Sequence, residues 1–168
     1  MRQQIYDAVN VEHIPYKAKH VAGYVDGYAN VPELRQRFPR ATLTTITVHG
    51  TIADVLDVEK GTVSLTYAVE WVKNMRHLGR RPIVYCSRSN WLPLREIFRN
   101  AKVKDPFWWI ADWTNEPHLL PGSIATQWQS SPAGYDQSSA AKGFPKAKLS
   151  LYKRIVKKLN YIQYPQAG

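Results

Sequence analysis

Two carboxylates separated by one residue, Asp57 and Glu59, end an apolar run in the stretch ADVLDVEKG (residues 53–61). On a β-strand, residues two apart face the same way, with about 6.5–7 Å between their Cα atoms. The pattern therefore predicts that both acids project together, with Val58 on the opposite face. Carboxylate pairs suit glycosidic cleavage, because one group donates a proton to the leaving oxygen while the other stabilises positive charge at the anomeric carbon. From the spacing alone, a structural ion pair or a helix cap is an equal alternative.

Further acids stand at the ends of other predicted strands, namely Asp7, Asp26, Asp112 and Asp136. In parallel α/β sheets and barrels, ligands bind at the carboxyl ends of the strands. The sequence thus indicates a cleft lined by carboxylates. A general acid in such a cleft must stay protonated at the working pH, so we expect burial and the nearby Asp57 to raise the pKa of Glu59.

Tryptophans are concentrated in two segments of the last third, FWWIADW (residues 107–113) and TQWQSS (residues 126–131). Strand alternation places some of these rings in the core, and a single ring is more often a core residue than a ligand platform. Trp113 and Trp128 stand nearest to predicted strand ends, where an aromatic face can pack on the C–H groups of a sugar. These two residues are therefore candidate substrate contacts.

Residues that commonly bind metals give no pattern. The five histidines show no ligand spacing such as His-x-x-x-His, so we expect neither a metal nor a cofactor. The single cysteine, Cys86, lies in the middle of a predicted strand and excludes an intramolecular disulfide. We expect it to be a buried, inert thiol.

Apolar and β-branched runs recur at short spacing and predict eight strands. The strands are expected at residues 3–9, 20–26, 42–49, 53–59, 82–87, 107–112, 124–129 and 134–138. Apolar residues at helical spacing predict helices at 31–38, 64–79 and 90–103. Strands therefore alternate with helices in the first two thirds, as in parallel βαβ units, whereas the last three strands lack room for crossover helices.

These motifs, taken in order, resemble the family 25 glycoside hydrolases, which are the N-acetylmuramidase lysozymes of bacteria and their phages. The resemblance rests on Asp7 at the end of the first strand, LDVE at 56–59, PIVYCS at 82–87 before an aromatic-led helix, WIADW at 109–113, QWQSS at 127–131 and YDQSS at 135–139. It covers most of residues 3–139. It implies the family fold, an irregular TIM-like α/β barrel in which five βα units are followed by three strands.

The resemblance also implies roles for individual residues. Glu59 corresponds to the general acid, and Asp57 to the partner that orients the substrate or stabilises the cation. Asp7 is a third catalytic candidate on the same floor. The substrate contacts expected on this basis are Asp136, Trp113, Trp128, Tyr85, Asp26 and His49. The implied activity is cleavage of the β-1,4 glycosidic bonds of peptidoglycan.

Two other functions stay open. The segments IYDAVNVEHIP (residues 5–15) and TVHG (residues 47–50) depart from the family's motifs. A non-catalytic barrel that binds glycan, or that forms a structural part of a virion or envelope, is therefore the main alternative. A doubly wound α/β domain binding magnesium and phosphate is a third possibility, and the lack of a glycine-rich phosphate loop argues against it.

The formal net charge of +10 favours an anionic partner such as peptidoglycan or another cell-wall polymer. Residues 137–168 carry seven Lys or Arg and no acid, so we expect a barrel over residues 1–140 and a basic helix or tail over residues 141–168. No nucleic-acid motif accompanies the charge. No apolar run is long enough for a transmembrane segment, and the first residues lack a signal peptide, as expected for a phage lysin released from the host cytoplasm or carried on the virion.

Overall fold

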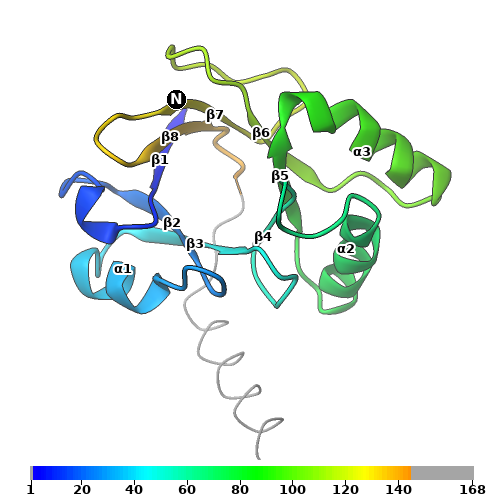
Figure 1. The fold of residues 1–168 in the computed structure, drawn as a ribbon, viewed down its shortest axis with the longest axis horizontal. Helices are drawn as coiled ribbons and strands as arrows, with labels where there is room; N and C mark the ends of the chain where they lie inside the picture. Colours follow the sequence, from blue (N-terminus) through cyan, green and yellow to red (C-terminus); the bar gives the residue numbers. More distant parts are fainter. Residues whose placement is uncertain (1, 145–168) are drawn as a thin grey trace, which may run out of the picture.

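Eight strands form a closed barrel in chain order in the computed structural model, which describes residues 2–144 (Figure 1). The strands are β1 (Gln3–Asp7), β2 (His20–Tyr24), β3 (Thr42–Thr47), β4 (Val55–Asp57), β5 (Ile83–Ser87), β6 (Phe107–Ala111), β7 (Ala125–Ser130) and β8 (Asp136–Ala140). All eight predicted strands are confirmed, and each begins within about two residues of its expected position. The expected basic helix beyond residue 144 lies outside the described residues.

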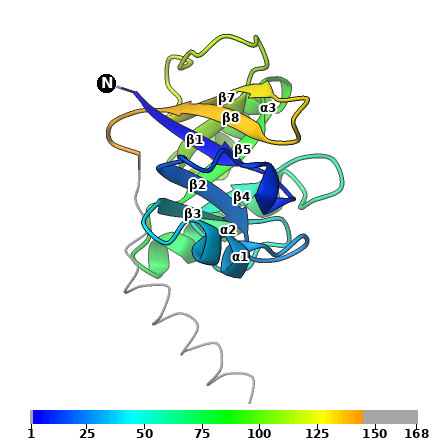
Figure 2. The same ribbon diagram turned by 90° about the vertical axis from the view of Figure 1, so that its left-hand side faces the viewer.

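Strand direction gives the barrel two different ends. Neighbouring strands from β1 to β7 are parallel, whereas β8 is antiparallel to both β7 and β1. Figure 2 shows β1 lying between β2 and β8. One end of the barrel therefore collects the carboxyl ends of seven strands and the start of β8. We call it the carboxyl end, and the opposite one the amino end.

Three connections contain an α-helix, and the predicted helices are confirmed at α1 (Val31–Arg37), α2 (Tyr67–His77) and α3 (Arg88–Asn100). The β1–β2 connection has only a 3-10 helix, η1 (Val11–His13). Residues 48–54 between β3 and β4 form no helix, because seven residues are too few for a crossover helix of ordinary length. The fold is thus a mixed α/β barrel in which strands dominate. The five βα units of the expectation are represented by three α-helical connections, one 3-10 connection and one loop.

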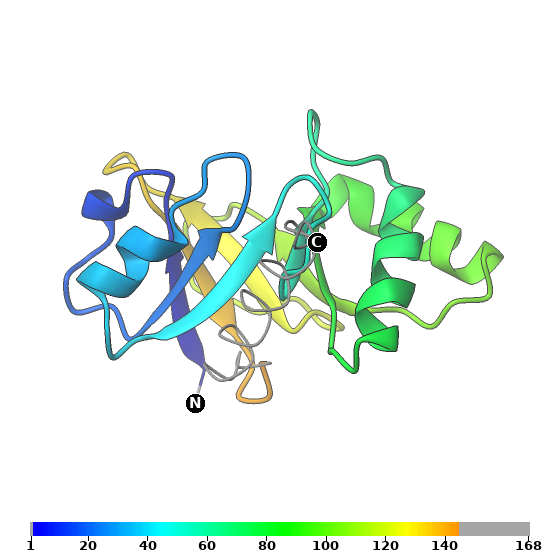
Figure 3. The same cartoon turned by 90° about the horizontal axis from the view of Figure 1, so that it is seen from below.

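The helices lie on two sides of the barrel, with α1 and η1 on one side and α2 and α3 on the other (Figure 3). On the second side, apolar residues of α2 and α3 pack against the outer faces of β4, β5 and β6. Trp71 of α2 and Phe98 of α3 are among the largest fully buried side chains. The Ser87 side chain caps α3 by accepting a hydrogen bond from the Asn90 amide. Cys86 is fully buried in this cluster, and burial raises the pKa of its thiol to about 12, so it is protonated at neutral pH.

The barrel interior is apolar in its middle and polar at its carboxyl end. The middle layer consists of Ile5, Ala22, Ile46, Val55, Ile83, Trp109, Ala125 and Ala140, and Phe144 belongs to the same cluster. Because strand residues two apart share a face, the next inward positions on five of these strands are Asp7, Tyr24, Asp57, Tyr85 and Gln127. The alternation that builds the core thus also places acids and their polar neighbours directly above it.

The amino end of the barrel interior is closed by Phe144, which is 3% exposed. Its ring lies edge-on to Trp109 at 5.8 Å between centroids and to His20 at 5.5 Å. Among residues 2–144, no helix has the length and apolar character needed to cross a membrane.

Candidate active site

Asp57 and Glu59 lie at the carboxyl end of β4, where the strand passes into a turn. The Thr62 amide donates to the Glu59 carbonyl at 3.2 Å, and Gly61 adopts φ +92°, a conformation that favours glycine. The Thr62 hydroxyl also accepts a hydrogen bond from the Glu59 amide at 2.9 Å. β4 ends at Asp57, so Glu59 lies just beyond the strand and not within it as expected. The turn nevertheless keeps the two acids close enough that the charge of Glu59 acts on the Asp57 carboxyl.

Asp57 points into the barrel and is 7% exposed, while Val58 packs in the outer cluster against α2. Burial raises the pKa of Asp57 to about 7, and the neighbouring Glu59 carboxylate adds to the rise. Its Oδ1 atom is buried and has no hydrogen-bond partner among residues 2–144. Buried polar atoms are normally hydrogen bonded, so an unpartnered carboxylate oxygen beside a second acid indicates a position that receives a ligand.

Asp7 and Asp136 face each other across the antiparallel pair of β1 and β8. Asp7 is 4% exposed, and its Oδ1 atom is also buried without a hydrogen-bond partner in the described part of the chain. Burial raises the pKa of Asp7 well above its ordinary value, and the charges of Asp136, Asp57 and Glu59 act in the same direction. Burial also raises the pKa of Asp136, against hydrogen bonds from Ser130 and Gln127. The four acids therefore form one interacting group that holds protons at neutral pH more readily than isolated carboxyls do.

Glu59 is the acid of this group that is exposed to solvent. Partial burial of its carboxyl and the charge of Asp136 raise its pKa, while a hydrogen bond from the Tyr85 hydroxyl lowers it. The direction expected from the sequence is thus confirmed, with burial as the main cause and the charge of Asp136 of β8 as an addition that the sequence did not predict. An accessible carboxyl with a raised pKa can deliver a proton to a ligand at the mouth of the barrel.

Gln127 connects the acids to an exposed aromatic side chain. Its Oε1 atom accepts hydrogen bonds from the Tyr85 hydroxyl and from the indole nitrogen of Trp113, both at 2.8 Å. Its Nε2 atom donates to Oδ2 of Asp136 at 3.1 Å. Trp113 is 62% exposed, so one ring face is available beside the acids. This network places an exposed aromatic ring beside the acids, and the contact of Trp113 with a sugar stays a prediction.

Three other predicted contacts lie apart from this network. Both oxygens of Asp26 accept hydrogen bonds within the protein, from the Val48 amide at 2.7 Å and from the hydroxyls of Thr47 and Thr51. These bonds hold the pKa of Asp26 below its ordinary value despite partial burial. His49 is exposed in the same loop, and its charge acts on Asp26. Asp26 therefore anchors the β3–β4 loop and has little capacity left for a ligand.

Trp128 is only 6% exposed, which leaves almost no ring face for a sugar. Its indole nitrogen has no hydrogen-bond partner among the residues that the structure describes. The strand-end acid Asp112 is likewise engaged, because it pairs with Arg88 and His118, both at 2.9 Å. These interactions lower its pKa, in contrast to the acids of the barrel floor.

Two members of the site were not predicted from the sequence, Tyr24 and Gln127. The pKa of Tyr24 is raised by burial and by the charges of Asp7, Asp57, Asp136 and Glu59, which places its hydroxyl among the acids. The signal for both was strand alternation. Each lies two residues after a small inward residue, Ala22 or Ala125, on the face that carries Asp7 and Asp57 on their own strands.

In the part of the chain that the structure describes, no group of three or more His, Cys, Asp or Glu side chains has an arrangement able to hold a metal ion. Comparisons of the chain with protein-family models, with curated proteins and with solved structures gave no match. The interpretation of the site therefore depends on its own geometry and chemistry.

Proposed function

We propose that this protein is a glycoside hydrolase of the N-acetylmuramidase type, which cleaves β-1,4 bonds of peptidoglycan at the carboxyl end of its barrel. The observation that carries the proposal is the pair of buried carboxyls, Asp7 and Asp57, each with an unpartnered oxygen, beside the exposed Glu59 whose pKa is raised. Neutral acids and carboxylates side by side are the groups that glycosidic cleavage uses.

In the proposed reaction, the Glu59 carboxyl protonates the glycosidic oxygen as the bond to the anomeric carbon breaks. A water molecule supplies the hydroxyl that ends on the anomeric carbon, and its remaining proton replaces the one that Glu59 gave to the leaving group. Glu59 is assigned this role over Asp57 because its carboxyl is exposed, whereas Asp57 lies on the floor. The positive charge that develops on the sugar faces Asp57 and Asp7. This charge lowers the pKa of both carboxyls, whereas burial raises it, so their ionised forms are favoured when the sugar is charged.

The Tyr85 hydroxyl has one proton and two neighbours, Glu59 and the Gln127 amide. When Glu59 is ionised, Tyr85 can donate to it. When Glu59 is protonated, it can donate to Tyr85, and Tyr85 donates to Gln127. This arrangement lets the acid change its charge without leaving a buried polar group unpaired.

Substrate specificity in this proposal comes from an aromatic rim and an acidic floor. The exposed ring of Trp113 supports one sugar, while Asp136 and Tyr85 contact polar groups of the next one. The order of the motifs, the raised pKa values and the closed barrel with strand-end acids agree with the family 25 resemblance. The proposal also includes the finer fold of that family, five βα units followed by three strands. This chain has α-helices in only three of those connections.

The proposed setting is the bacterial cell wall, reached as a phage lysin or as a virion-borne enzyme. The net charge of +10 supports an anionic wall as the partner.

The test is digestion of purified peptidoglycan by the wild type and by Glu59→Gln, with mass spectrometry of the released fragments. We expect new reducing muramic-acid ends from the wild type and a loss of about 10²–10⁴-fold in rate for the variant. Glu70→Gln is the matched control, because Glu70 is an exposed acid of α2 paired with Lys73, and it should keep full activity.

The pH profile is a second measurement in the same assay. A general acid must be protonated, so activity should fall as the pH rises through the raised pKa of Glu59. A wild type that releases no fragment at any pH would contradict the proposal and favour a glycan-binding or structural barrel.

A further inference from the structure

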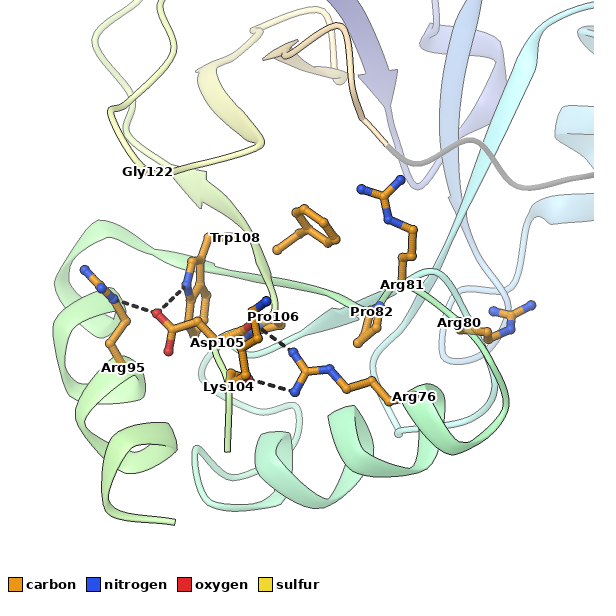
Figure 4. A pocket seen from close by; sticks show the side chains of 11 residues that line it. Arg76, Arg80, Arg81, Pro82, Arg95, Lys104, Asp105, Pro106, Trp108 and Gly122 are labelled. Carbon is orange, nitrogen blue, oxygen red and sulfur yellow. Dashed lines mark hydrogen bonds and ion pairs between the residues drawn. The ribbon is translucent and has the colours of Figure 1, made fainter. Parts of the chain in front are cut away.

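A second charged region lies at the amino end of the barrel, remote from the acids. It is a pocket of about 480 Å³ between the end of α2, α3 and the segments that enter β5 and β6 (Figure 4). Its basic lining side chains are Arg76, Arg80, Arg81, Arg95 and Lys104, and its one acid is Asp105. The pocket does not share a residue with the site proposed for hydrolysis.

Only part of this positive charge is neutralised by the protein. Arg95 pairs with Asp105 at 2.8 Å, and Arg80 lies 3.6 Å from Asp54. Arg76 has no ion pair among the described residues, but the charge of Asp105 acts on it, so Arg81 and Lys104 are the two basic lining residues without a carboxylate partner in that part of the chain. Clustered cations repel one another, so an anion that enters the pocket is stabilised by the net positive charge of its lining.

The pocket is held in shape by its own hydrogen bonds. The Arg76 guanidinium donates to the carbonyls of Lys104 and Asp105, both at 2.8 Å, which fixes the segment that carries the Lys104 side chain. The Arg81 guanidinium lies over the Phe107 ring, 4.7 Å from its centroid. Stacking on a ring orients a guanidinium and leaves its N–H edge free for an oxyanion. The guanidinium groups of Arg76 and Arg81 are thus held in fixed orientations at the pocket.

We propose that this pocket binds a phosphate group of a phosphodiester-linked cell-wall polymer, with Arg81 and Lys104 as the direct contacts. Arg and Lys side chains form charge-assisted hydrogen bonds with phosphate oxygens. The pocket is larger than one phosphate, which leaves room for the polyol units on either side. The choice of a wall polymer rests on the proposed function.

The aromatic residues of the pocket argue against nucleic acid. Single-stranded nucleic acids bind through positive grooves together with free aromatic faces on which bases stack. Here Trp108 is 3% exposed and the Phe107 face is covered by Arg81. A polyanion without bases therefore fits the lining better.

The test compares the binding of three probes to the full chain at low ionic strength. The probes are a purified glycerol-phosphate oligomer, inorganic phosphate and single-stranded DNA with the same number of phosphates. The pocket variant is Arg81→Gln/Lys104→Gln, and both residues are exposed, so the fold should be kept. The matched control is Lys17→Gln/Lys19→Gln, which removes the same charge from exposed residues near the start of β2.

We expect the pocket variant to bind the oligomer about tenfold more weakly or worse, and the control to stay within about twofold of the wild type. Equal losses in the two variants would show that only overall charge matters and would overturn the pocket. DNA binding of equal strength with the same dependence on Arg81 and Lys104 would overturn the wall polymer as the ligand. Absence of binding to all three probes would overturn the proposal altogether.

This test is separable from the test of hydrolysis. Binding is measured with Glu59→Gln as well as with the wild type, and hydrolysis is measured on peptidoglycan stripped of its phosphate polymer. Loss of binding with intact hydrolysis contradicts only the pocket, whereas binding without hydrolysis contradicts only the enzyme.

Discussion

The two ends of this barrel are built from the same strands but differ in what fills them. At the carboxyl end, the inward positions are acids and their polar neighbours, and two buried carboxylate oxygens have no hydrogen-bond partner within residues 2–144. At the amino end, the interior is closed by the Phe144 ring packed against Trp109. The difference shows how a barrel separates tasks, because the apolar end stabilises the fold while the acidic end reduces its stability in favour of chemistry.

The two ends of the barrel also differ in the sign of the charge that they carry. Acids of β1, β8 and the end of β4 project into the barrel at the carboxyl end, whereas basic side chains gather around the segments that enter β5 and β6. A molecule with such a distribution orients itself in the field of an anionic surface, with the basic end toward the surface.

The largest expected effect tests the amino end as the stabilising one. Phe144→Ala removes a ring that is 3% exposed, so we expect the free energy of unfolding to fall by about 3–5 kcal/mol. The measurement is urea unfolding at pH 5. Tyr16→Ala, which truncates a 78% exposed ring, is the control and should change stability by less than about 0.5 kcal/mol. If Phe144→Ala lowers the free energy of unfolding by less than about 1 kcal/mol, the claim that the amino end stabilises the fold is contradicted.

The next effect tests whether the carboxyl end costs stability. Because the pKa of Asp57 is raised from 3.8 to about 7, the folded state binds this proton more tightly than the unfolded chain does. Stability is therefore lost as the pH rises from about 4 to about 7. Asp57→Asn removes this loss, so we expect the variant to be more stable than the wild type by about 2–4 kcal/mol at pH 8 and about equal to it at pH 4.

The control for this prediction has the opposite sign. Asp112→Asn removes a carboxyl whose pKa is lowered by Arg88 and His118, so the variant should be less stable than the wild type at pH 8. Thermal unfolding over pH 4–8 distinguishes the two variants. Parallel pH profiles for Asp57→Asn and the wild type would contradict the electrostatic account of the floor.

The smallest effect sharpens the picture of the carboxyl end. Trp113 is 62% exposed and rests on Gln127, so Trp113→Ala should leave stability nearly unchanged. If the ring supports a sugar, KM for soluble peptidoglycan fragments should rise about tenfold, which corresponds to about 1.4 kcal/mol of lost contact. Trp113→Phe, which keeps a ring and loses the indole hydrogen bond, should recover most of the affinity. A fall in kcat with unchanged KM would assign Trp113 to the chemistry instead of binding.

Sequence patterns predicted the framework better than the details of the site. Eight strands and three helices followed from apolar periodicity, because that periodicity is the same pattern that buries the core. Asp7 and Asp136 came together because β1 and β8 are neighbours in the closed barrel, and Asp57 of β4 joins them because its side chain also points into the barrel at the carboxyl end. Trp128 was chosen from its place near a strand end, but whether a ring is open to solvent depends on long-range packing that sequence spacing does not encode.

Asp26 shows a second limit. A strand-end acid can equally line a cleft or hold a loop, and the choice depends on partners elsewhere in the chain. Here the Thr47 and Thr51 hydroxyls and the Val48 amide take up the carboxylate. Glu59 was placed in the wrong element, because the turn through Gly61 begins two residues earlier than the apolar run suggested.

The antiparallel β8 has a consequence for the order of folding. Gln4 of β1 and Gln137 of β8 are hydrogen bonded across 133 residues of chain, so this strand pair closes the largest loop in the described sheet. Contacts so distant along the chain carry the highest loop-closure cost and tend to form late. The same pairing sets Asp7 opposite Asp136. Folding intermediates that have not closed the sheet therefore lack the assembled acidic floor. The pKa of these carboxyls should rise when β1 and β8 pair, so proton uptake marks the closure of the barrel.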